Sequence, residues 1–204
     1  MNKPSKPARR FRERKPKAPK LRCFIGIKFT LATAIDELRK ELATLADASD
    51  GQLRLVPDDN LHITLKFIGS VEESNLAAIE GVVKQVAARY QAMNLVVNGM
   101  GMFKTSAWVG VQAHSELSEI ASALNIACQP LGVLAEDKDY QPHVTLARFN
   151  KDSKTAIASL LEKYENQPWG EIRATTICLY RSDTLPEGAK YTVIDEVKLG
   201  TESN

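Results

Sequence analysis

The sequence predicts an α+β protein with mostly antiparallel sheets, and three observations support that class. Strand-like and helix-like segments alternate along the chain. No predicted strand–helix–strand unit carries a Gly-rich phosphate loop, so nothing in the sequence supports a nucleotide cofactor. One short histidine motif occurs twice, and each copy lies in a stretch with strands and a helix. This repetition indicates two lobes of similar architecture that meet at a groove.

Apolar spacing predicts the elements in chain order. Helical segments repeat apolar residues every three or four positions, as Leu38, Leu42 and Leu45 do, whereas the strands are short β-branched or aliphatic runs. We expect a strand at 22–28, a helix at 31–48, strands at 53–56 and 61–68, a helix at 72–90, strands at 93–97 and 107–112, a helix at 116–131, the strand of the second motif, a helix at 153–164, and strands at 172–180 and 190–198 joined by a turn at 185–188.

Composition is ordinary for one globular unit or two small lobes, because 44% of the 204 residues are hydrophobic and 25% are charged. No long apolar run and no secretory signal is present, so we expect a cytoplasmic protein without a membrane segment. A monomer is the working expectation, although the sequence does not determine the oligomeric state. Cys23, Cys128 and Cys178 are odd in number and far apart, which predicts reduced core thiols rather than a zinc site or a disulfide framework.

The repeated motif is His-x-Thr followed by Leu, and it begins at His62 and at His143. On a strand, residues i and i+2 share a face, so His62 lies beside Thr64 and His143 beside Thr145. Histidine can give or take a proton near neutral pH, and a threonine hydroxyl can donate a hydrogen bond to a phosphoryl oxygen. A single motif of this kind is more often structural, but two copies favour an acid/base site for a phosphodiester that requires no metal.

The motifs and their flanks resemble the 2H phosphoesterases, and within that superfamily the RNA 2',3'-cyclic phosphodiesterases, also called 2'-5' RNA ligases. The resemblance extends from about Arg22 to Leu199. It rests on RCFIGI at 22–27, VPDDNLHITLKFIG at 56–69, YQPHVTLAR at 140–148 and LYRS at 179–182. It implies a two-lobed, pseudo-twofold fold in which antiparallel sheets line a central groove and the helices lie outside.

The same resemblance implies hydrolysis of 2',3'-cyclic phosphate ends of RNA, tRNA fragments among them, to 2'-phosphomonoesters. Reverse 2'-5' RNA ligation is implied as a second activity. Carried over by position, His62 is the proton donor to the leaving 3'-oxygen and His143 is the base that activates water. Thr64 and Thr145 hold the phosphate, and neither a cofactor nor a metal is implied.

Four further residues are candidates for contact with the phosphate. Arg148 matches a basic residue of the family, but strict alternation from His143 places it on the opposite face, so it reaches the phosphate only if the strand ends or bulges there. Lys66 has the parity of His62, although a cation at a strand edge is also an ordinary surface residue. Arg181 and Ser182 are expected in the loop after a long apolar strand.

The chain divides into a basic N-terminal arm (residues 1–21), the two-lobed domain (22–199) and a short C-terminal tail (200–204). Residues 1–22 hold ten Lys and Arg but one acidic residue, a net charge of +9, whereas the remainder carries −7. With almost no apolar side chains, the arm cannot fold alone. Contact with RNA phosphates and simple solvation both remain open for it.

Alternative functions also remain open. A 2H enzyme that acts on small cyclic nucleotides or on 2'-5' oligonucleotides would use the same acid/base residues. A non-catalytic RNA-binding relative is the third possibility, and the intact histidines and threonines of both motifs argue against it.

Overall fold

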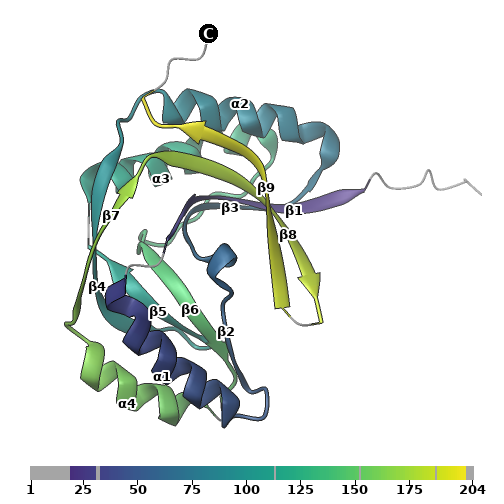
Figure 1. Ribbon diagram of the computed structural model, residues 1–204. Helices are drawn as coiled ribbons and strands as arrows, with labels where there is room; N and C mark the ends of the chain where they lie inside the picture. The colour runs from purple at the N-terminus through teal and green to yellow at the C-terminus, as the bar shows by residue number, and fades with distance from the viewer. Residues whose placement is uncertain (1–18, 31–32, 113, 152, 187, 201–204) are drawn as a thin grey trace, which may run out of the picture.

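The computed structural model describes residues 19–30, 33–112, 114–151, 153–186 and 188–200, and within them the strands form one continuous sheet (Figure 1). The 9-stranded sheet has the order β7-β4-β5-β6-β3-β1-β8-β9, with β2 paired to β6, and its neighbouring strands are antiparallel. The strands are β1 (Lys20–Lys28), β2 (Leu53–Leu55), β3 (His62–Glu72), β4 (Met93–Met102), β5 (Ser106–Val111), β6 (His143–Phe149), β7 (Pro168–Ala174), β8 (Thr176–Leu185) and β9 (Gly188–Lys198). The helices are α1 (Asp36–Asp47), α2 (Leu76–Ala87), α3 (Ser115–Ala127) and α4 (Lys154–Tyr164).

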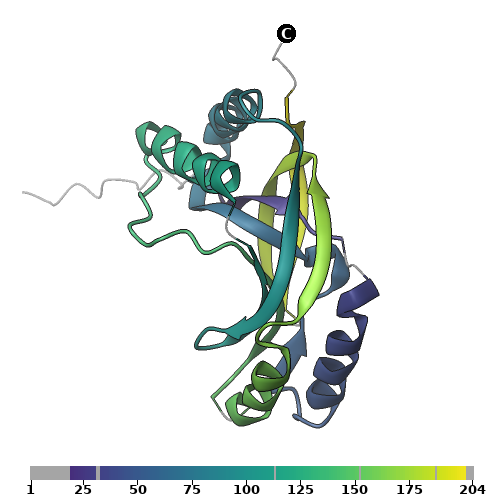
Figure 2. The same cartoon turned by 90° about the vertical axis from the view of Figure 1, so that its left-hand side faces the viewer.

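Two lobes meet at the middle of this sheet, because β3 and β6 pair only through Ile63 and Val144. The first lobe contains β3, β1, β8 and β9 with helices α2 and α3, and the second contains β6, β5, β4, β7 and β2 with helices α1 and α4. Figures 1 and 2 show the two helix pairs at opposite ends of the molecule. The predicted α+β fold with two lobes and antiparallel strands is confirmed.

The lobes are not continuous stretches of chain, contrary to the sequence-based expectation that each motif and its surroundings form one lobe. The chain passes from β1 in the first lobe to α1 and β2 in the second, and returns for β3. Strands β8 and β9, at the end of the chain, complete the first lobe beside β1. Each motif strand is therefore supported by segments from distant parts of the sequence.

Most element boundaries differ slightly from the prediction, and strand pairing explains the main differences. β1 begins at Lys20 and β3 ends at Glu72, because these two residues are register partners. The helix expected from residue 72 therefore begins only at Leu76. The single strand expected at 172–180 is two strands: β7 pairs with β4, whereas β8 pairs with β1. Of the predicted arm and tail, residues 1–18 and 201–204 lie outside the described residues.

The apolar core lies between the sheet and the helices and fixes the backs of the two motif strands. Ile63, Leu65, Val144 and Leu146 are all buried in it. Their polar neighbours are consequently held on the opposite face, toward the groove. The three cysteines are buried and unpaired, as predicted. None of the described helices is both long enough and apolar enough to span a membrane.

Candidate active site

The four side chains of the two motifs lie together at the junction of the lobes. Because Ile63 is the antiparallel partner of Val144, His62 lies across from Thr145 and Thr64 across from His143. All four are partly exposed, in contrast to the buried residues between them. The charge of His143 acts on the pKa of His62, in keeping with this proximity.

Each motif strand carries a β-bulge at the same position. Between β1 and β3, Gly26 pairs with Thr64 and Ile25 with Lys66, so Leu65 is the extra residue. Between β5 and β6, Trp108 pairs with Thr145 and Ala107 with Ala147, so Leu146 is the extra residue. Each bulge reverses the alternation that follows it. The two strands therefore have the same burial pattern over their first seven residues.

The bulges decide the orientation of two candidate residues in opposite ways. Arg148 is exposed on the side of His143 and Thr145, and its charge acts on the pKa of both histidines. The strict alternation that assigned it to the opposite face does not hold. Lys66 lies on the face opposite to that of His62 and is 1% exposed. Its Nζ donates to the carbonyl of Leu134 at 2.8 Å and forms an ion pair with Glu136 at 3.1 Å. The parity argument for Lys66 is therefore wrong.

Arg181 and Ser182 lie within strand β8 and not in a loop, because β8 continues to pair with β9 as far as Leu185. Arg181 is the partner of Cys23, which belongs to the core face of β1, so Arg181 points away from His62. Its guanidinium is bound by Asp183 at 2.8 Å. Ser182 pairs with Tyr191 and lies on the groove face.

Both histidines are oriented in the same way by a backbone carbonyl two residues earlier. Nδ1 of His62 lies 2.7 Å from the oxygen of Asn60, and Nδ1 of His143 lies 2.7 Å from the oxygen of Gln141. A carbonyl can only accept, so Nδ1 carries the hydrogen and Nε2 of each neutral ring is left as a free acceptor.

Burial and positive charge lower the pKa of both imidazoles. Burial lowers the pKa of His62 to about 4, and the charges of Arg148 and His143 act in the same direction against the opposing hydrogen bond from the ring to Asn60. The pKa of His143 is lowered by burial and by Arg148. Both rings are therefore mostly neutral at pH 7 without a bound anion.

Aromatic rings surround each histidine, and sequence reasoning did not identify them. Phe24 and Tyr191 lie 4.6 and 5.1 Å from the ring of His62, centroid to centroid. Phe103 and Trp108 lie 5.0 and 5.7 Å from His143. These residues come from β1, β9, the turn after β4, and β5, so only the spatial pairing of the strands could have revealed them. The buried Nε1 of Trp108 has no hydrogen-bond partner among the described residues.

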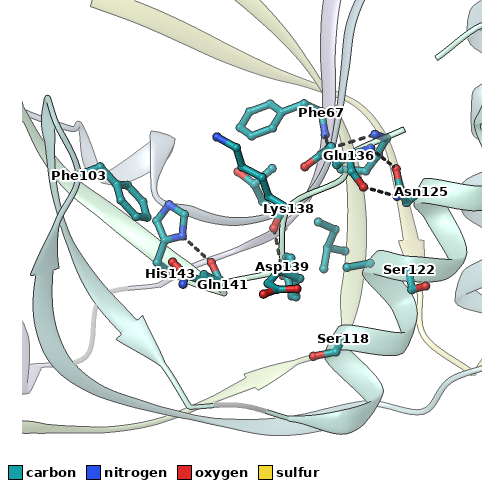
Figure 3. Close-up of a pocket in the computed structure, with 15 residues that line it drawn as sticks. Phe67, Phe103, Ser118, Ser122, Asn125, Glu136, Lys138, Asp139, Gln141 and His143 are labelled. Carbon is teal, nitrogen blue, oxygen red and sulfur yellow. Dashed lines mark hydrogen bonds and ion pairs between the residues drawn. The ribbon is translucent and has the colours of Figure 1, made fainter. Parts of the chain in front are cut away.

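A cavity of about 580 Å³ adjoins His143 and Thr64. Figure 3 shows Phe103 and His143 on one side of it and Ser118, Ser122 and Asn125 of α3 on the other. The rings of Phe67 and Phe103, which are 57% and 41% exposed, are its apolar walls. The segment between α3 and β6 is held across β3, since the hydroxyl of Tyr140 donates to the carbonyl of Thr64 at 3.0 Å.

No group of three His, Cys, Asp or Glu side chains in the described part of the chain is arranged to hold a metal ion. The convergent groups are instead two imidazoles, two hydroxyls and one guanidinium. This set can transfer protons and bind a phosphate.

Comparison with known proteins identifies relatives over most of the chain. Residues 27–185 match the family model of the 2'-5' RNA ligase superfamily. The RNA 2',3'-cyclic phosphodiesterase of Methanothermobacter thermautotrophicus is 31% identical over 179 residues, which cover 83% of this chain and 97% of the relative. That of Archaeoglobus fulgidus is 29% identical, with 80% of this chain and 94% of the relative covered.

Solved structures share the fold. TT0787 of Thermus thermophilus superposes with a TM-score of 0.68 at 23% identity, covering 90% of this chain and 100% of that one. Escherichia coli LigT, solved in complex with 3'-AMP, gives a TM-score of 0.64 at 22% identity, with the same coverage of both chains. On the match to the family model and the similarity to these relatives, the chain belongs to the 2'-5' RNA ligase superfamily.

Proposed function

We propose that this protein hydrolyses 2',3'-cyclic phosphate ends of RNA to 2'-phosphomonoesters without a metal ion. The main observation behind the proposal is the arrangement of His62 and His143, whose Nδ1 atoms are both occupied by carbonyls, so that two Nε2 atoms are available beside two threonines and Arg148. The names of the relatives support the same substrate class.

In the proposed reaction, Nε2 of His143 takes a proton from a water molecule as its oxygen attacks the phosphorus. The bond between phosphorus and the 3'-oxygen breaks, and Nε2 of protonated His62 donates its proton to that oxygen. The hydroxyls of Thr64 and Thr145 and the charge of Arg148 stabilise the phosphoryl oxygens. One water molecule is consumed, and the phosphate remains on the 2'-oxygen.

The low pKa of His62 fits this role only when the substrate is bound. In the free protein a pKa of about 4 leaves little imidazolium at pH 7. A phosphate anion next to the ring favours the charged form and raises the pKa. Substrate binding therefore favours the protonated form of His62, so the proton donor forms in the complex with the substrate.

The cavity beside the histidines favours a nucleotide end over a simpler phosphodiester. Phe67 and Phe103 expose aromatic surface there, and bases stack on such rings in a sequence-tolerant way. A 5'-hydroxyl of a second RNA that replaced the attacking water would give a 2'-5' linkage by the same proton transfers. Ligation is thus proposed as a secondary activity, and small cyclic nucleotides are the alternative substrates.

The test is an assay of the purified chain on an RNA oligonucleotide with a 2',3'-cyclic phosphate end, with and without EDTA. We expect a 2'-phosphomonoester, identified by phosphorus NMR, at the same rate in both conditions. A 3'-phosphate product would contradict the assignment of the leaving group. Loss of activity with EDTA, restored by one divalent metal, would contradict the metal-free mechanism.

A further inference from the structure

Two arginines face each other across strands β2 and β6. Arg54 is the direct partner of Arg148, and both are exposed. The adjacent pair, Leu53 and Phe149, is buried in the core. Since alternate residues of a strand point to opposite faces, the two guanidinium groups lie on the face away from the core, which is also the face of His143.

Within the residues that the structure describes, the charges of this pair are not neutralised. Like charges directly opposite each other in a sheet are destabilising. Among the described residues, no carboxylate forms a salt bridge with either arginine. Arg54 donates to two neutral carbonyls, from Nε to Gly51 at 3.3 Å and from Nη1 to Pro186 at 3.2 Å. These contacts orient the guanidinium and leave its charge available for an anion.

Hydrogen bonding to Pro186 also connects Arg54 to the turn between β8 and β9. Figure 1 shows this end of the hairpin near β2. Arg54, on a strand of the second lobe, is therefore hydrogen-bonded to the end of a hairpin of the first lobe. A long side chain fixed at both Nε and Nη1 loses less conformational freedom when it binds a ligand than a free one does.

The two arginines differ in their relation to the histidines. Arg148 lowers the pKa of both His62 and His143, so its charge reaches the reacting phosphate. Arg54 is not among the groups that shift the pKa of either histidine. Arg54 lies beside Arg148 on the neighbouring strand β2, one strand away from the strand that carries His143.

We propose that Arg54, beside Arg148, binds the internucleotide phosphate on the 5' side of the terminal nucleoside. This inference rests on the proposed function. Guanidinium groups bind phosphate oxygens through paired hydrogen bonds, and an RNA end carries such a phosphate one nucleotide before the cyclic one. A free cyclic mononucleotide has none. Arg54 thus distinguishes RNA ends from free cyclic mononucleotides.

Three substrates test this assignment. The first is adenosine 2',3'-cyclic phosphate, and the second is the dinucleotide ApA with the same cyclic end. The third is that dinucleotide with a methylphosphonate between the nucleosides, which replaces one charged oxygen by a methyl group. Each is assayed with the wild type, with Arg54→Gln and with the matched control Arg173→Gln. Arg173 is an exposed arginine of β7 that donates to Asn94.

We expect Arg54→Gln to lower kcat/KM for the dinucleotide about tenfold and for the mononucleotide by less than about twofold. On the methylphosphonate the variant and the wild type should differ by less than about twofold, because the charge that Arg54 binds is absent. Arg173→Gln should match the wild type on every substrate. Thermal unfolding of each variant establishes that the fold is intact, and Arg54→Lys, which retains the charge, should recover part of the loss.

Equal losses on the mononucleotide and the dinucleotide, or a loss that persists on the methylphosphonate, would overturn the assignment. So would an unchanged rate on the dinucleotide. If the wild type cleaves none of the substrates, the proposed function fails, and the uncleaved dinucleotide and mononucleotide then serve as ligands in calorimetry. A selective loss of dinucleotide affinity in Arg54→Gln would still support the subsite, and no selective loss would overturn it.

Discussion

Strands β3 and β6 share a bulge position and a burial pattern, but the side chains that follow the bulge differ. Each begins with a histidine whose Nδ1 faces a carbonyl, continues with a groove-facing threonine, and bulges at a leucine. After the bulge, β3 continues with Lys66 and Phe67, whereas β6 continues with Ala147 and Arg148. The equivalent groove-facing position is therefore a phenyl ring in one lobe and a cation in the other.

This difference makes the surroundings of the two motifs chemically different, although the motifs themselves are related by pseudo-twofold symmetry. Arg148 and Arg54 lie on one side of the β3–β6 junction and make it positive, whereas Phe67 lies on the other side and lines the cavity together with Phe103. An RNA end has matching parts, since its phosphates are charged and its bases stack. The two histidines can thus have different roles although their local geometry is the same.

The largest expected effect comes from removing either histidine. We expect His62→Ala and His143→Ala each to lower kcat by roughly two to four orders of magnitude, because each removes one partner in proton transfer. The double variant should lose far less than the product of the two single losses. Single-turnover rates on the cyclic-ended RNA, with circular dichroism as a fold control, test both expectations. Near wild-type turnover in either folded variant would refute the two-histidine mechanism.

Arg148→Gln should have the next largest effect and should change the pH dependence. We expect kcat/KM to fall about 10- to 100-fold, because a group proposed to stabilise the phosphoryl oxygens is removed.

The dependence of kcat/KM on pH in the wild type should be bell-shaped with its optimum below pH 6.5, because both histidine pKa values are lowered and that of His62 is about 4. Removing a cation favours imidazolium and raises both pKa values, so the whole bell should move to higher pH.

The measurement is kcat/KM across pH for the wild type, Arg148→Gln and the control Arg173→Gln, whose profile should coincide with that of the wild type. A profile in Arg148→Gln that is lower but not displaced would show that Arg148 binds substrate without acting on the histidines. In the wild type, kcat should reach its maximum at a higher pH than kcat/KM, because the bound phosphate raises the pKa values in the complex.

Lys66 provides a smaller test of the same comparison. Its ammonium is buried against Glu136 and the carbonyl of Leu134, and its counterpart in β6 is an alanine. We expect Lys66→Met to change the free energy of unfolding by about 2 kcal/mol or less, since Glu136 is half-exposed and can be solvated. Turnover should remain within about threefold of the wild type. A large rise in KM at unchanged stability would instead support Lys66 as a substrate contact, since it is among the residues that line the cavity.

The contrast between Lys66 and Arg148 also shows which side-chain orientations could be predicted from the sequence. Period-2 alternation correctly paired each histidine with its threonine, because two residues span no irregularity. The bulges at Leu65 and Leu146 arise from pairing with β1 and β5, which no local pattern encodes. Alternation therefore placed Lys66 on the wrong face, and it could place Arg148 on the groove face only on the condition of a bulge. The α+β class followed from local periodicity. The division of the lobes did not, since β8 and β9 join β1 only in the folded chain.

The smallest expected effect concerns the basic arm that the sequence predicts before the folded domain. Deletion of residues 1–18 leaves β1 intact, since that strand begins at Lys20. If the arm touches RNA phosphates, the deletion should weaken binding of long RNAs and flatten its dependence on salt, because fewer counterions are released. Turnover of a cyclic mononucleotide should be unchanged, since both motif strands lie beyond residue 60.

Fluorescence anisotropy with a long RNA at several salt concentrations distinguishes the two interpretations of the arm. A salt slope unchanged by the deletion would indicate a solvated extension. If Arg54→Gln and the deletion each weaken binding, and the double variant shows the product of the two losses, the arm and the arginine pair contact different phosphates. Losses that overlap would mean that both act on the same part of the RNA, and the positive end of the groove would then extend into the arm.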